Sequence, residues 1–151
     1  MIKNIIFDFG GVILPVEPMD YARGMIELGC KEIEALHIKF QKEQVYIRFE
    51  KGEMNPEEFR DQLRSGLDNH VPDEKLDAAW KMMLGEIPAN RVRFLDDLRK
   101  SYRTFLLSNT NIIHYDIYSK ELKEKFGYDT LDCLFDKVYL SFELGMRKPD
   151  T

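Results

Sequence analysis

The chain has 151 residues, of which 44% are hydrophobic and 32% charged, so it can bury a core and is not a disordered segment. Lys and Arg total 22 against 27 Asp and Glu, and the resulting net charge of −5 argues against a nucleic-acid partner, which needs a basic surface. No apolar run reaches the length of a membrane-spanning helix, so we expect no membrane partner.

The N-terminal segment is the first predicted element. Residues 2–9 are an apolar run, β-branched and aromatic, that ends at Gly10 and Gly11, which is typical of a central parallel strand. Asp8 interrupts the run, so we interpret it as a buried strand and not as a signal peptide. The two glycines allow the backbone to turn sharply at the carboxyl end of this strand.

Residues 17–85 show helical periodicity and no convincing strand. Apolar side chains recur on one face until Gly52 breaks the pattern, and the motif Asn55-Pro56-Glu57-Glu58 predicts a helix start with a capping box. Trp80 lies on a later amphipathic stripe, where we expect core packing rather than contact with a substrate. The apolar positions that carry these patterns are Ile33, Leu36, Phe40, Ile47, Phe59, Leu63, Leu67, Leu76, Ala79 and Met83.

Strands and helices alternate again after Pro88. The pattern predicts helices at 91–101 and 117–126, the second ending at Gly127, and strands at 104–107 and 137–140. This order indicates an α/β fold, a Rossmann-like parallel sheet with an all-helical cap inserted after the first strand. We assign residues 1–16 and 88–151 to the core and residues 17–87 to the cap.

Four polar positions follow the ends of these strands. The carboxyl ends of parallel strands meet at one edge of a sheet, so Asp8, Ser108, Asn109 and Lys148 should lie near one another. A carboxylate there can attack phosphorus, while a hydroxyl, a backbone N–H and a cation hold the phosphoryl oxygens. A carboxylate beside a phosphate also needs Mg²⁺ to offset the repulsion between them.

Three segments resemble the motifs of the haloacid dehalogenase (HAD) superfamily: IIFDFGGVI, LLSNTN and LSFELGMRKPD, in that order. The resemblance is greatest to the subgroup of glucose-1-phosphate phosphatases, whose cap also resembles the stretch EKGEMNPEEFRDQL. It implies a Mg²⁺-dependent phosphatase that acts on a small phosphorylated metabolite, such as a sugar phosphate, through an aspartyl-phosphate.

The resemblance also implies roles for particular residues. Asp8 would be the nucleophile and a Mg²⁺ ligand, and the backbone carbonyl of Gly10 would be a second ligand. Ser108 and Lys148 would complete the catalytic set, and both would bind the phosphoryl group together with Gly11 and Asn109.

Two departures from the family pattern affect these expectations. Most phosphatases of the superfamily carry an acid at the position of Gly10, so here we expect substrates with good leaving groups, such as anomeric phosphates. The family's fourth motif, an acidic pair that completes the metal site, does not follow Lys148, and Asp96-Asp97 lies ahead of the second motif. We therefore expect a piece of a longer protein that is catalytically impaired by itself.

A missing strand would leave the edge of residues 2–9 free, from which we expect a homodimer or a segment swap. The remaining alternatives are a non-catalytic module that binds a phosphometabolite or a protein, and, less favoured, a dehalogenase. A dinucleotide turn is disfavoured because the GxGxxG spacing is absent. The three histidines have no ligand spacing, and the two cysteines lie far apart without a CxxC motif, as expected for reduced packing thiols in a cytoplasmic protein: His37, His70, His114, Cys30 and Cys133.

Overall fold

A three-stranded parallel sheet organises the first lobe of the molecule. The computed structural model describes residues 2–150, and in it β1 (Asn4–Phe7), β2 (Arg103–Ser108) and β3 (Lys137–Leu140) pair in that order. Phe7 of β1 pairs with Leu106, and Ser108 at the end of β2 pairs with Leu140. The strands therefore end at a common edge, and the predicted α/β class is confirmed.

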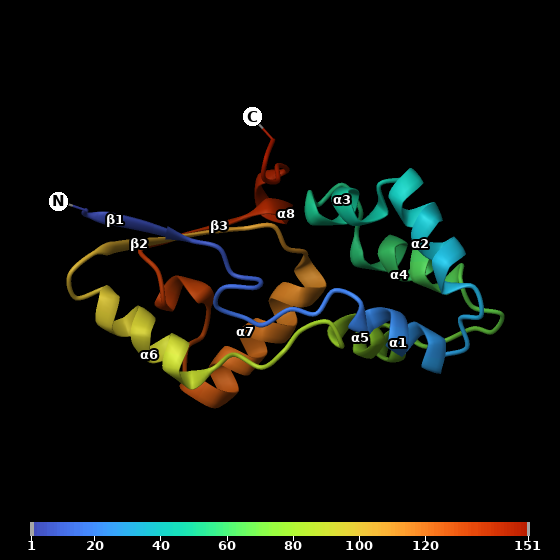
Figure 1. Ribbon diagram of the computed structural model, residues 1–151, viewed down its shortest axis with the longest axis horizontal. Coiled ribbons are helices and arrows are strands. Elements are labelled where there is room, and N and C mark those ends of the chain that lie inside the picture. The colour runs from blue at the N-terminus through green and yellow to red at the C-terminus, as the bar shows by residue number, and fades with distance from the viewer. Residues whose placement is uncertain (1, 151) are drawn as a thin grey trace.

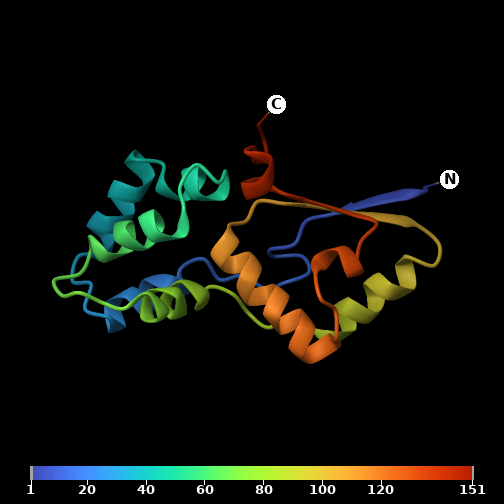
Figure 2. The same ribbon diagram turned by 180° about the vertical axis from the view of Figure 1, so that it is seen from behind.

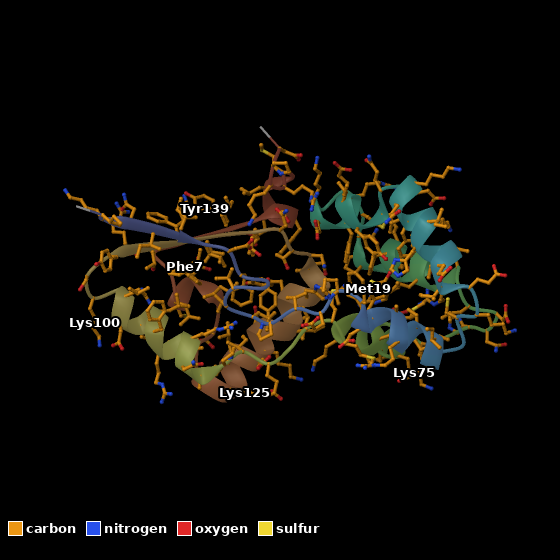
Figure 3. The ribbon with its side chains drawn as sticks, in the orientation of Figure 1. Phe7, Met19, Lys75, Lys100, Lys125 and Tyr139 are labelled. Carbon is orange, nitrogen blue, oxygen red and sulfur yellow. The ribbon has the colours of Figure 1, made fainter. Side chains whose placement is uncertain are left out.

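The helices of this lobe cover one face of the sheet. Figure 1 shows α6 (Ala89–Leu98) and α7 (Ile112–Phe126) on the same side of the strands. Phe7 points to that side and packs on Phe135 with ring centroids 6.1 Å apart, whereas Tyr139 lies on the opposite side (Figure 3). On the opposite face Ile6 is 68% exposed, so that face of the sheet is open to solvent.

Five helices form a second lobe between β1 and α6. They are α1 (Asp20–Glu27), α2 (Ile33–Lys42), α3 (Val45–Glu50), α4 (Pro56–Arg64) and α5 (Asp73–Lys81). The second lobe has its own apolar core, to which α7 of the sheet lobe adds Ile113. The predicted all-helical insertion after the first strand is confirmed, and Figure 2 shows both lobes from behind.

The chain crosses between the lobes twice, and the two crossings pair with each other. Val16 and Leu84 form an isolated antiparallel bridge, the amide of Glu17 donates to the Met83 carbonyl at 2.8 Å, and the amide of Gly85 donates to the Pro15 carbonyl at 2.8 Å. Met19, where the chain enters the helical lobe, lies at this boundary (Figure 3). These hydrogen bonds join the two crossing segments to each other, so they form a single paired connection between the lobes.

Local signals in the sequence account for two helix starts. Asn55 Oδ1 accepts from the amide of Glu58 at 2.9 Å, and the amide of Asn55 donates to Glu58 Oε2 at 2.8 Å, so the predicted capping box is present. At α7 the side chain of Asn111 accepts from the amide of His114, which starts the helix five residues earlier than predicted. Gly127 ends α7 in the left-handed region, as expected.

Other details of the prediction are wrong. Ile47 belongs to α3 and not to the helix that carries Leu36 and Phe40, because the chain turns at Gln44, which has a φ of 52°. The first strand is shorter than residues 2–9. Two short elements were not predicted, η1 (Leu131–Cys133) and α8 (Ser141–Leu144), and the second of these leads to Lys148.

Candidate active site

The carboxyl edge of the sheet carries an ion pair. Asp8 directly follows β1, and its Oδ2 lies 2.7 Å from the ammonium nitrogen of Lys148, which arrives after α8. The amide of Phe9 donates to Asp8 Oδ1 at 2.8 Å, and Lys148 Nζ also donates to the carbonyl of Leu107 at 2.8 Å. Asp8 and Lys148 are 140 positions apart, and the parallel strands bring them together.

Asn109 holds the backbone of Lys148 in place. Its side-chain oxygen accepts from the amide of Lys148 at 2.8 Å, and its side-chain nitrogen donates to the carbonyl of Lys148 at 3.0 Å. The sequence predicted a backbone role for Asn109 toward phosphate and gave no signal for this side-chain clamp. A second tie lies alongside, since Ser141 Oγ accepts from the amide of Thr110 and donates to its carbonyl, both at 2.9 Å.

The loop after Asp8 turns tightly. The carbonyl of Phe9 accepts from the amides of Val12, Ile13 and Leu14, and Gly11 has a φ of +76°, which a residue with a side chain rarely adopts. Within residues 2–150, no donor uses the carbonyl of Gly10 in this loop. A free carbonyl oxygen therefore stands two residues from the Asp8 carboxylate.

A cavity of about 560 Å³ opens between the sheet edge and the helical lobe. From the sheet edge it is lined by Gly10, Gly11, Ser108 and Asn109, and Ser108 is otherwise buried. Asp8 and Lys148 are not among its lining residues, because they pair with each other just outside it. The helical lobe and α7 supply the rest of the polar and aromatic wall, including Tyr21, His37, Tyr46, Glu50, Trp80 and His114.

Two histidines of this wall have defined partners. The hydroxyl of Tyr21 lies 2.8 Å from His37 Nδ1 and also contacts the hydroxyl of Tyr46. His114 stacks on Trp80 with centroids 4.9 Å apart, and burial lowers the pKa of His114 to about 4. Burial likewise raises the pKa of Tyr46. Trp80 is both core and cavity wall, and the sequence predicted only the first.

The metal site can be judged by its donors. Asp8 and the carbonyl of Gly10 offer oxygen atoms only, which suits a hard cation such as Mg²⁺. Among the described residues, no cluster of three or more His, Cys, Asp or Glu side chains could hold a metal ion. Mg²⁺ commonly binds to one or two carboxylates and completes its shell with water and phosphate, so the two donors present fit such an ion.

Comparison with known proteins identifies the family. No family model matches the chain. A D-ribitol-5-phosphate phosphatase from Bacteroides thetaiotaomicron is 33% identical over 151 residues, an alignment that covers 99% of this chain and 72% of the relative. The chain belongs to the HAD family of hydrolases. The family predicted from the three motifs is therefore confirmed.

Solved structures agree with this assignment. A HAD-family enzyme from Bacteroides thetaiotaomicron, solved in complex with magnesium and inorganic phosphate, superposes with a TM-score of 0.89 at 35% identity and covers 99% of this chain and 74% of that one. A HAD-like family hydrolase from Porphyromonas gingivalis gives a TM-score of 0.83 at 33% identity, with 99% and 71% covered. In residues 2–150 of this HAD chain, no helix combines the length and apolar character needed to cross a bilayer.

Proposed function

We propose that this HAD chain carries the phosphoryl-transfer site of a Mg²⁺-dependent phosphatase acting on a small phosphorylated metabolite. The contact between Asp8 and Lys148, beside Ser108 at the edge of the cavity, supports this function most directly. A carboxylate next to a cation and a hydroxyl offers a nucleophile together with groups that bind an anion. The same pattern serves dehalogenation at carbon less well, because that substrate carries no phosphoryl oxygens to hold.

The proposed reaction has two displacements at phosphorus. An oxygen of Asp8 attacks, forming the aspartyl-phosphate bond while the bond from phosphorus to the ester oxygen breaks, and the departing alkoxide takes a proton from water. Water then attacks phosphorus, loses a proton to solvent, and the Asp8 carboxylate is released with inorganic phosphate. Ser108 and Lys148 hold the phosphoryl oxygens in both steps.

Asp8 and the Gly10 carbonyl are the residues that would hold Mg²⁺. When bound, the ion supplies positive charge that offsets the repulsion between the carboxylate and the phosphate. The related enzyme solved with magnesium and inorganic phosphate supports this cofactor and a phosphorylated ligand.

The cavity and the relative support a class of substrate. The wall opposite the sheet edge combines aromatic rings with hydroxyl and imidazole groups, which suits a polyhydroxylated carbon chain. We infer that residues 17–87 act as the cap over the core of 1–16 and 88–151, and that alditol or sugar phosphates bind beneath it. The substrate in the relative's name, D-ribitol 5-phosphate, is an ester of a primary alcohol and is the first compound to test.

Gly10 affects which leaving groups the site can expel, because a glycine at this position supplies no general acid. A Cβ atom at Gly10 would meet only Val16 Cγ2, at 3.3 Å, so Gly10→Asp is accommodated with a small shift. We expect this variant to raise turnover of alkyl phosphates more than that of anomeric phosphates, by roughly 10²-fold or more. Phosphate release measured on glucose 1-phosphate and ribitol 5-phosphate checks this, and a large gain on the anomeric ester alone would contradict it.

Steady-state phosphate release tests the function. With Mg²⁺ and ribitol 5-phosphate we expect slow turnover by the chain, and a loss of about 10²-fold or more in Asp8→Asn and Lys148→Met, which remove the nucleophile and the cation. Lys100→Met is the matched control, because Lys100 pairs with Asp97 on the surface. Equal rates of phosphate release in the wild type and in the three variants would refute the proposal. Mg²⁺-dependent phosphate binding without turnover would favour a non-catalytic binding module.

A further inference from the structure

The segment that carries Lys148 contacts the helical lobe through two ion pairs. Arg147 Nε donates to Glu50 Oε2 at 2.8 Å, and Lys51 Nζ lies 2.7 Å from Asp150 Oδ2. Glu50 and Lys51 are consecutive at the end of α3, and their charges are matched in order by Arg147 and Asp150. All four side chains are partly covered, with exposed fractions between 23% and 35%.

The backbones also approach closely at this point. Gly52 follows the two charged residues with a φ of +69°, and a Cβ atom placed on it would lie 2.4 Å from the carbonyl oxygen of Phe142 in α8. Only a glycine allows this approach. Figures 1 and 2 show α3 next to α8, at a place separate from the paired crossings between the lobes.

Lys148 is consequently held from two sides. From the sheet lobe, Asn109 binds its backbone and the Leu107 carbonyl accepts from its ammonium group. From the helical lobe, the two ion pairs bind residues on either side of it in the chain, Arg147 and Asp150. The side chain of Lys148 then reaches Asp8, so a shift of this segment would move the ammonium group away from the nucleophile.

We propose that the pairs Glu50–Arg147 and Lys51–Asp150 form a latch that couples seating of the helical lobe to placement of Lys148 at Asp8. This inference rests on the proposed function. The four residues are positioning residues, since they act through Lys148. When both ion pairs of the latch are formed, Glu50 lines the cavity and the ammonium group of Lys148 lies at Asp8. The site is therefore complete only when the helical lobe covers it.

The pair Lys51–Asp150 gives the cleanest test, because neither residue lines the cavity. Partly exposed ion pairs add little to folding stability, so the variants Lys51→Glu, Asp150→Lys and the double exchange are expected to fold. Kinetics on ribitol 5-phosphate should show kcat reduced roughly three- to tenfold in each single variant with KM nearly unchanged, and restored in the double exchange. Lys31→Glu is the matched control, because Lys31 pairs with Asp68 within the helical lobe at 2.5 Å.

A second measurement does not depend on turnover. Trp80, the single tryptophan, belongs to α5 and stacks on His114 of α7, so its accessibility reports on the contact between the lobes. Acrylamide quenching of its fluorescence should increase in Lys51→Glu and return to the wild-type value in the double exchange. Unchanged quenching in folded Lys51→Glu, or a double exchange that restores neither kcat nor quenching, would overturn the latch. Absence of turnover in the wild type with the predicted quenching pattern would refute the phosphatase proposal and keep the contact between lobes.

Discussion

At the scale of single residues, His114 is a buried base in the aromatic part of the cavity wall. Its ring stacks on Trp80, and its Nε2 lies 3.4 Å from the Trp80 carbonyl. Burial lowers its pKa from 6.5 to about 4, so the folded state holds the imidazole neutral where the unfolded chain would protonate it. Stability is therefore present above pH 6.5 and is lost as the pH falls toward 4.

The variant His114→Phe keeps the aromatic stack and removes the titrating group. Between pH 7 and pH 4 the wild type should lose up to about 3 kcal/mol of unfolding free energy relative to this variant, which follows from about 1.4 kcal/mol per pKa unit. Urea unfolding at several pH values measures the difference. A constant difference across that range would show that His114 titrates normally.

The predicted proximity of Asp8 and Lys148 is confirmed by their contact. The parallel order of the strands brings their carboxyl ends to one edge, and Lys148 reaches Asp8 there through the segment that follows β3. The clamp by Asn109 and the latch at Glu50 could not be predicted in this way. Glu50 and Arg147 are 97 positions apart, and their contact depends on how a helical lobe seats against a loop, which no local pattern encodes.

At the scale of elements, local signals succeeded where a side chain acts on its own helix end. The capping box at Asn55 is one such case. The strand at 137–140 was also predicted from its own residues, because β-branched Val138 and aromatic Tyr139 favour an extended backbone. The predictions failed where tertiary contacts decide, as at Gln44, where a left-handed residue separates α2 from α3. Short α8 was missed for the same reason.

The capping box makes a quantitative prediction about α4. Asn55→Ala removes the acceptor for the Glu58 amide and should lower the unfolding free energy by about 1 kcal/mol, whereas Asn55→Asp keeps the acceptor and should change it little. Chemical denaturation of the three proteins measures both values. A loss in Asn55→Asp as large as that in Asn55→Ala would show that the cap hydrogen bond does not stabilise α4.

At the scale of the whole molecule, one face of the sheet carries no helix in residues 2–150. Ile6 and Leu107 are exposed on it, beside the partly exposed Phe105 and Tyr139, and β1 is an edge strand. Parallel sheets are normally covered on both faces, and free apolar edges pair with other strands. We therefore expect the chain to self-associate through this face.

Sedimentation velocity over a range of concentrations measures this association. Ile6→Lys should shift the chain toward the monomer, because it places a charge on the exposed face of the edge strand β1. Ile26→Lys is the control, since Ile26 is also exposed but lies in the helical lobe. A wild-type monomer at every concentration, or an equal effect of both substitutions, would contradict this expectation.

Asp8 is the proposed nucleophile at phosphorus, and trapping of the covalent aspartyl-phosphate tests this role. The chain is mixed with Mg²⁺ and ribitol 5-phosphate, quenched in acid within milliseconds to seconds, and analysed by peptide mass spectrometry. We predict one added phosphoryl group on the peptide containing Asp8, removed by hydroxylamine and absent from Asp8→Asn. Phosphate release without an adduct on Asp8, or an adduct that persists in Asp8→Asn, would contradict this role of Asp8.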